Sequence, residues 1–204
     1  MPIEIEKKYR LTDAQVEPLR RRLEEAGAEG GGAAEFEENT IYTGPNLDPS
    51  RRVLRLRRKG ARAVFTFKER DPGKTAVKRQ REEETEVSDA AALAAILEAL
   101  GYRPVLVYEK RRETFRLPGA EVVLDELPFG LFAEIEGEEA AILEAEKLLG
   151  LDGAEGVHES YPALTLRHGT KKGDVVEARF QGSCSGRSPL GGLLLPDGRR
   201  SEKS

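Results

Sequence analysis

The sequence predicts an α+β domain built around an antiparallel sheet of about eight strands. Short segments in which apolar and charged residues alternate recur along the chain, and residues 3–9 are the first of them. This period of two is typical of a half-buried strand. Most of these segments are joined by turns of a few residues, and short turns join antiparallel neighbours. Three segments with apolar residues at helical spacing complete the pattern.

The first helix is expected directly after the first strand, because Thr12 and Gln15 form a capping-box motif and Gly27 ends the apolar spacing. The other strands are expected at residues 36–43, 53–59, 62–69, 77–87, 105–116, 121–126 and 131–137. A second helix is expected after Ser88, as its cap, and ends near Leu100. A third is expected over residues 138–149, before Gly150.

Length and composition limit the number of domains, the partners and the cellular location that can be expected. The length of 204 residues suits one domain, expected over residues 1–168, and a Gly-, Ser- and Arg-rich tail over 169–204, expected to be poorly ordered. Acids outnumber bases, 37 to 33, so neither nucleic acid nor membrane is an expected partner. The single cysteine, Cys184, excludes an internal disulfide. The sequence has no secretory signal pattern and no membrane-spanning apolar run, which predicts a cytoplasmic protein.

Sorting the strand residues by parity separates two faces. The apolar face carries Ile3, Ile5, Leu54, Leu56, Phe65, Phe67, Leu131, Ala133 and Ile135. The charged face carries Glu4, Glu6, Lys8, Arg55, Arg57, Lys68, Lys110, Arg112, Asp125, Glu134 and Glu136. The helices should pack on the apolar face. The charged face then lines the lumen of a closed barrel or faces water on an open sheet, and the pattern alone leaves both arrangements open.

The types of charge indicate the ligand. Arg and Lys at fixed spacing suit phosphate oxygens. Clustered carboxylates without histidine or cysteine suit hard cations, Mg²⁺ or Mn²⁺. A polyanion held by the basic residues and bridged by metal to the carboxylates would use both sets.

A series of motifs carries a resemblance to a known family. In chain order they are Glu4-x-Glu6-x-Lys8, Leu54-Arg55-Leu56-Arg57, Thr66-Phe67-Lys68, Lys110-Arg111-Arg112, Leu124-Asp125, Phe132-x-Glu134-Ile135-Glu136 and Ser160-Tyr161. Together they resemble the CYTH domain, the family of class IV adenylate cyclases and thiamine triphosphatases, also called triphosphate tunnel metalloenzymes. The resemblance covers about residues 3–165.

The resemblance implies a closed eight-stranded antiparallel β-barrel, a tunnel with helices packed on its outside, that binds a triphosphate and divalent metal. The triphosphate-binding positions are Lys8, Arg55, Arg57, Lys68, Lys110 and Arg112. The metal positions are Glu4, Glu6, Glu134 and Glu136, with Asp125 near a second metal. Glu6 and Lys8 are the expected catalytic residues, and Lys8 would help to orient the attacking water.

The strand at residues 77–87 departs from the family pattern, which has Arg-x-Glu-x-Glu there. If Thr85 and Val87 face the helices, Glu82 and Glu84 face the lumen and join the metal set. The other register would turn Arg81 and Glu83 inward. The first register is preferred because the apolar positions set it, although it places Gln80 where the family has arginine.

Three functions remain open at this stage. The favoured one is metal-dependent hydrolysis of a triphosphate-containing small molecule: inorganic triphosphate, a nucleoside triphosphate or thiamine triphosphate. The second is a class IV adenylate cyclase, which would need a base pocket for which the sequence has no legible signature. The third is a non-catalytic polyphosphate-binding module. The protein is expected to be a monomer or a homodimer.

Overall fold

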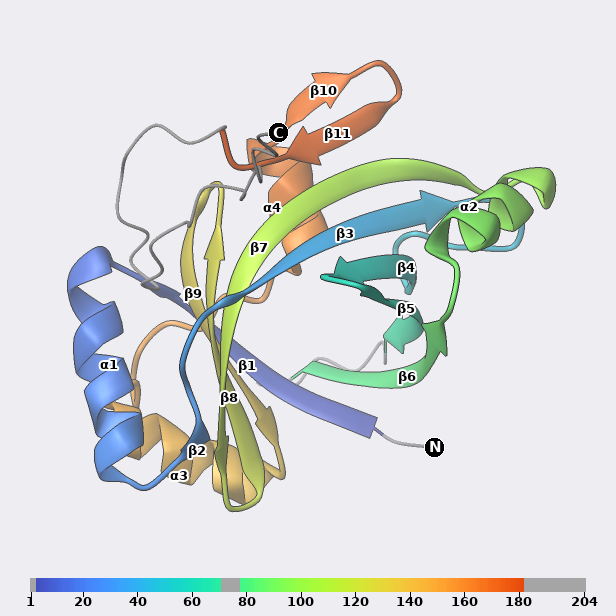
Figure 1. The fold of residues 1–204 in the computed structure, drawn as a ribbon. Helices are drawn as coiled ribbons and strands as arrows, with labels where there is room; N and C mark the ends of the chain where they lie inside the picture. The colour runs from blue at the N-terminus through green and yellow to red at the C-terminus, as the bar shows by residue number, and fades with distance from the viewer. Residues whose placement is uncertain (1–2, 71–77, 182–204) are drawn as a thin grey trace, which may run out of the picture.

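The computed structural model describes residues 3–70 and 78–181 (Figure 1). The helices are α1 (Asp13–Glu25), α2 (Ala90–Ala99), α3 (Glu139–Leu149) and α4 (Tyr161–His168). The strands are β1 (Ile3–Leu11), β2 (Glu29–Gly30), β3 (Glu35–Thr43), β4 (Arg52–Lys59), β5 (Arg62–Arg70), β6 (Lys78–Val87), β7 (Arg103–Leu117), β8 (Ala120–Leu127), β9 (Gly130–Gly137), β10 (Thr170–Lys172) and β11 (Val175–Ala178). Every strand expected from the sequence is present, which confirms the α+β class.

The strands form one strongly curled sheet, in the order β10-β11-β7-β3-β4-β5-β6-β1-β9-β8. All pairings are antiparallel except the parallel contact of β11 with β7. The last strand, β8, also pairs with β7. The predicted antiparallel sheet is therefore confirmed.

The family resemblance implies a closed barrel, but the sheet is not closed along its full length. The pairing of β7 explains why. Residues 103–112 of this strand pair with β3, whereas residues 111–117 pair with β8. Among the described residues, Arg111 and Arg112 are therefore the ones that pair with both β3 and β8. The sheet has the shape of a half-barrel whose two ends meet over a short stretch of one long strand.

Helices α1, α2 and α3 cover the outer, apolar face of the sheet, as predicted, whereas α4 packs at one end of the inner face. Figure 1 shows α1 and α3 outside the curl, beside β1, β8 and β9. Leu23 of α1 and Ile142 of α3 are fully buried in one core cluster with Ile135 of β9. Leu97 of α2 packs in another cluster with Leu56 of β4. The inner face carries the charged residues of alternate parity and, beside α4, an apolar cluster that includes Tyr108 and Phe132.

The helix ends follow local chemistry. The backbone amide of Thr12 donates to Gln15 Oε1 at 2.8 Å, as the capping-box motif predicts. Gly150 ends α3 in the left-handed conformation (φ 66°), which glycine adopts without steric cost. The cap of α2 is Asp89, not Ser88, because the Asp89 carboxylate accepts from the Ala91 and Ala92 amides. Helix α4, which the sequence does not predict, begins after Ser160, whose hydroxyl accepts from the Ala163 amide.

The segment from residue 169 differs from the poorly ordered tail predicted for it. Residues 170–178 form a hairpin, β10 and β11, and β11 extends the sheet beside β7. Arg179 then forms ion pairs with Glu38 at 2.6 Å, Glu109 at 2.9 Å and Glu177 at 3.3 Å. These contacts join the hairpin to β3 and β7. The rest of the predicted tail, residues 182–204, lies outside the described residues, as does Cys184.

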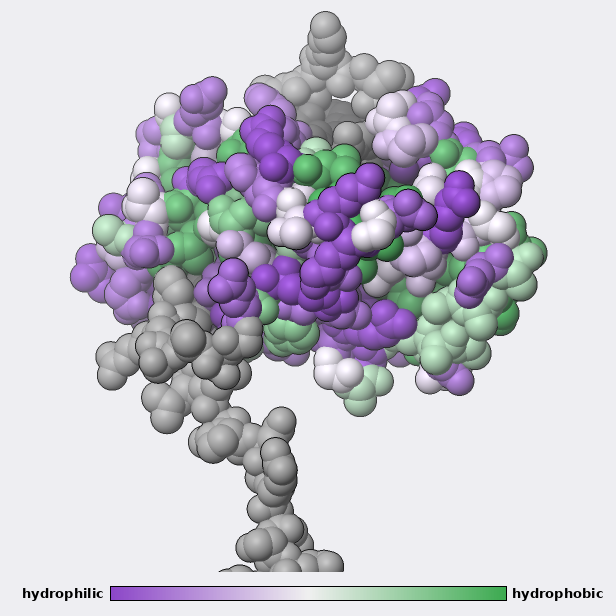
Figure 2. All heavy atoms as spheres, turned by 90° about the horizontal axis from the view of Figure 1, so that it is seen from above, coloured by the Kyte–Doolittle hydropathy of each residue, from purple (hydrophilic) through white to green (hydrophobic). Residues whose placement is uncertain are grey.

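The surface seen from above is largely hydrophilic, with smaller apolar areas between the charged side chains (Figure 2). Within residues 3–70 and 78–181, no helix combines the length and the apolar character that crossing a membrane requires.

Candidate functional site

A cavity of about 280 Å³ opens on the inner face of the curled sheet. The predicted site residues that line it are Glu6, Lys8, Arg55, Arg57, Lys68, Glu82, Glu84, Lys110, Arg112, Glu134 and Glu136. Asp125 is fully buried and does not line the cavity. The side chain of Glu4 lies outside the described residues. The structure thus brings together residues from β1, β4, β5, β6, β7 and β9 that are far apart in the sequence.

The strand register itself places opposite charges side by side. Lys8 of β1 lies directly opposite Glu134 of β9, and Lys68 of β5 lies directly opposite Glu82 of β6. Side chains of directly opposed residues lie on the same face and within reach of one another. Each of these two pairs forms an ion pair inside the cavity. The strand register therefore sets each of these two lysines beside a glutamate, and the opposite charges neutralise one another.

Lys8 is buried, and its ammonium group has three partners. Nζ lies 3.1 Å from Glu134 Oε1 and donates to the backbone oxygen of Glu159 at 3.0 Å. It also lies 3.9 Å from the centre of the Tyr161 ring, a favourable cation–π distance. Tyr161 belongs to the first turn of α4, so this short helix brings an aromatic wall to the charged cavity.

Asp125 of β8 joins three donors behind the cavity wall. Arg112 lies directly opposite it in the register and binds both of its oxygens, at 2.7 and 2.5 Å. The Tyr161 hydroxyl donates to Asp125 Oδ2 at 2.8 Å, and Lys110 Nζ lies 3.4 Å from the same oxygen. Arg112 also contacts Glu134 at 2.7 Å, so Asp125 is connected to the wall through Arg112.

Glu37 is a site residue that the sequence interpretation missed. It lies on β3, is 1% exposed, and its Oε2 is 3.4 Å from Lys110 Nζ and 3.5 Å from Arg57 Nε. Lys110 is therefore held between two buried carboxylates, Glu37 and Asp125. Tyr42, an even-numbered residue of β3, is buried in the outer core. Because side chains alternate along a strand, the odd-numbered residues of β3, including Glu37, face inward. This alternation is the signal that could have identified Glu37.

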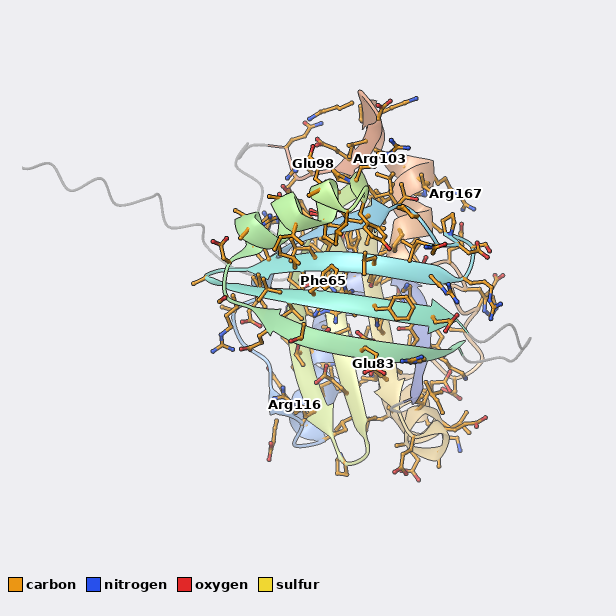
Figure 3. The ribbon with its side chains drawn as sticks, turned by 90° about the vertical axis from the view of Figure 1, so that its right-hand side faces the viewer. Phe65, Glu83, Glu98, Arg103, Arg116 and Arg167 are labelled. Atoms are coloured by element: carbon orange, nitrogen blue, oxygen red, sulfur yellow. The ribbon has the colours of Figure 1, made fainter. Side chains whose placement is uncertain are left out.

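On the opposite side of the cavity, β6 has the register that the sequence favoured. Glu82 and Glu84 line the cavity, and Arg55 lies 3.8 Å from each carboxylate. Glu83 is turned to the outside, where Figure 3 shows it on β6 and where it pairs with Arg81 at 3.1 Å. The side chain of Gln80, which stands at the position of the family's arginine, lies outside the described residues.

Burial and neighbouring charges shift the pKa values of Lys110 and Glu134 strongly. Burial, reinforced by Arg112, lowers the pKa of the Lys110 ammonium to about 8, although Asp125 and Glu37 act in the opposite direction. Burial alone would raise the pKa of Glu134, but Lys8 and Arg112 outweigh it and hold that pKa well below its usual range. At neutral pH the wall therefore carries a charged Glu134 and a Lys110 poised to lose its proton in mild alkali.

The carboxylates on the wall fit a hard cation by donor type. Glu6 lies directly opposite Glu136 in the β1–β9 pairing, and both line the cavity together with Glu134. Carboxylate oxygens are the donors that Mg²⁺ and Mn²⁺ prefer. Among the described residues, no three acidic or histidine side chains are gathered as a ready-made metal site. Glu134 is already engaged by Lys8 and Arg112.

The family model of the CYTH domain matches residues 2–161. The chain belongs to the CYTH domain family. The hairpin of β10 and β11 and most of α4 follow the matched region. No curated protein matches the sequence significantly.

Solved structures of similar fold agree with this assignment. The PH1012 protein of Pyrococcus horikoshii OT3 is 26% identical, with a TM-score of 0.67 over 78% of this chain and 96% of that one. A proposed adenylate cyclase of Vibrio parahaemolyticus is 24% identical, with a TM-score of 0.62 over 78% and 95%. HpAC1 of Hippeastrum, a proposed adenylyl cyclase described as having a dominant triphosphatase activity, is 18% identical, with a TM-score of 0.60 over 80% and 94%.

Proposed function

We propose that this CYTH protein hydrolyses a triphosphate with the aid of Mg²⁺ or Mn²⁺. The observation that carries the proposal is the composition of the cavity wall. Its basic side chains, Lys8, Arg55, Arg57, Lys68, Lys110 and Arg112, come from four strands and converge on one space. Such a set can contact a linear polyanion along its length, and several guanidinium groups allow bidentate contacts to phosphate oxygens.

The acidic residues supply the second requirement, a place for the metal. Glu6 and Glu136, with Glu134 beside them, would hold the cation, and Glu82 and Glu84 offer carboxylates on the facing side. A bound cation would neutralise charge on the phosphoryl group during transfer. In this proposal the basic residues bind and orient the triphosphate. Lys8, which lies between Glu134 and the Tyr161 ring, orients the attacking water.

The composition of the cavity favours hydrolysis of a compact triphosphate over cyclisation of ATP. Its wall is mostly charged, whereas a cyclase must also seat an adenine ring. HpAC1, described as having a dominant triphosphatase activity, is a precedent for hydrolysis in this fold.

The experiment is an incubation of the protein with tripolyphosphate or ATP and Mg²⁺ or Mn²⁺, with the products resolved by anion exchange. Release of orthophosphate supports the hydrolase. Cyclic AMP with pyrophosphate supports the cyclase instead. Binding of tripolyphosphate without turnover of either substrate supports the non-catalytic binder.

Two adjacent arginines of β4 provide the matched control. Arg57 lines the cavity, whereas Arg58 pairs with Glu38 at 3.3 Å and does not line it. Arg57→Gln should weaken tripolyphosphate binding at least about 10-fold, the loss expected for one charge-assisted contact. Arg58→Gln should leave binding unchanged. Equal losses in both variants would point to a general effect of net charge and count against the cavity.

A further inference from the structure

Asp125 is fully buried behind the cavity wall, and four hydrogen bonds engage its two oxygens. Oδ1 accepts from Arg112 Nε, and Oδ2 accepts from Arg112, Tyr161 and Lys110. The residue is 0% exposed and is absent from the cavity wall. A carboxylate that already receives this many donors has little capacity left for a metal ion.

Its neighbours on β9 have a different environment. Glu134 and Glu136 line the cavity, and Glu136 lies opposite Glu6 across the β1–β9 pairing. The side chain of Asp125 instead lies behind Arg112, which separates it from Glu134 by contacting both carboxylates. The family pattern that places Asp125 near a second metal therefore does not fit the geometry of this chain.

We propose that Asp125 is a positioning residue for the triphosphate-binding cations and not a metal ligand. Asp125 binds Arg112 through two oxygens and thereby fixes the plane of its guanidinium group. On the other side, Glu37 and Asp125 hold the Lys110 ammonium between them. Tyr161 donates to Asp125 and so locks its orientation.

This arrangement has a clear energetic reason. Arg112 and Lys110 are both largely buried, and their positive charges repel one another. Each therefore needs a nearby anion that does not occupy the part of the cavity where the triphosphate would bind. An anion behind the wall meets that need, because it offsets the repulsion and leaves the cavity side of the cations available to phosphate oxygens. A group held in place before binding loses less entropy on binding.

The test separates metal binding from triphosphate binding in the folded protein. Mn²⁺ alone and tripolyphosphate alone, without metal, are titrated into wild type, Asp125→Asn and Glu136→Gln. We expect Asp125→Asn to weaken tripolyphosphate binding at least about 10-fold, because Arg112 loses the carboxylate that binds it through two oxygens and keeps only Glu134. The Kd for Mn²⁺ should change less than about twofold. Glu136→Gln should show the reverse pattern.

Asp125→Asn leaves buried cations uncompensated and can unfold the protein, so Tyr161→Phe is measured as well. It removes one donor to Asp125 and retains the ring under Lys8. We expect it to weaken tripolyphosphate binding about threefold to 10-fold with Mn²⁺ binding unchanged.

The inference rests on the proposed function, and the two can fail separately. A 10-fold loss of Mn²⁺ affinity in Asp125→Asn, with tripolyphosphate binding intact, would overturn the positioning role alone. Unchanged tripolyphosphate binding in Tyr161→Phe would also count against it. If wild-type protein binds neither probe, the proposed function fails first and the positioning role with it.

Discussion

The ammonium group of Lys8 and the carboxylate of Glu134 meet at 3.1 Å because the two residues are direct partners in the β1–β9 register. The same ammonium lies over the ring of Tyr161, which belongs to helix α4. Lys8 therefore contacts both a carboxylate of the cavity wall and the aromatic ring of Tyr161. This pairing also controls the protonation of Glu134, since Lys8 is the strongest of the cations that lower its pKa.

Replacement of Lys8 by methionine should lower kcat/KM for tripolyphosphate about 100-fold, the typical cost of losing one preorganised charged donor. It should also move the acid limb of the pH profile of kcat/KM to higher pH. Without Lys8 the pKa of Glu134 rises, so this carboxylate becomes protonated at a higher pH. Lys7→Met is the control, because Lys7 pairs with Glu146 outside the cavity. An unmoved acid limb in Lys8→Met would contradict the coupling.

Replacement of Glu6 by glutamine should abolish metal-dependent turnover, by at least about 100-fold, while the protein stays folded. Glu6 lies opposite Glu136 on the cavity wall, and an amide is a much weaker metal ligand than a carboxylate. The measurement is turnover as a function of Mn²⁺ concentration, with circular dichroism as the check on folding. Glu83→Gln, on the outer face of β6, should behave as wild type. Wild-type turnover in Glu6→Gln would contradict the metal assignment.

The pKa of Lys110 predicts an alkaline limit to substrate capture. Because burial lowers that pKa to about 8, the side chain is a cation below this pH and loses its charge above it. The value of kcat/KM, which reports the free enzyme, should therefore fall above about pH 8 with the loss of one proton. Lys110→Arg should remove this limb, since arginine stays charged throughout the range. A profile that still falls near pH 8 in this variant would assign the limb to another group.

The parity of the strands made much of the site predictable from the sequence. Leu54 and Leu56 belong to the outer face, so Arg55 and Arg57 had to share the inner one. The same argument selected Glu82 and Glu84 in a strand where nearly every residue is charged.

Glu37 was not predictable in the same way, because β3 breaks the usual polarity. Thr40 of this strand lies opposite Leu56, on the side of the outer core, whereas Ile41 lines the charged cavity. Because a polar residue faces the outer core and an apolar residue faces the charged cavity, the sequence of β3 does not show which residues face inward. Helix α4 and the β10–β11 hairpin were missed for another reason. They are short, and contacts with β7, which ends more than 40 residues earlier in the chain, hold them in place.

Glu37 also predicts how stability depends on pH. Burial alone would raise its pKa, but Lys110, Arg112 and Arg57 together lower it well below the ordinary value of 4.5. A carboxyl group whose pKa is depressed in the folded state stabilises the fold above its unfolded pKa and loses that contribution as pH falls. Glu37→Gln should therefore reduce the free energy of unfolding by about 3–5 kcal/mol at pH 7, the cost of breaking a buried charge pair. The difference from wild type should shrink as pH falls below about 4.5, where the unfolded state takes up a proton that folded Glu37 does not. Urea unfolding of both proteins at neutral and acidic pH measures this difference, and a constant gap across that range would show that the loss comes from packing and not from charge.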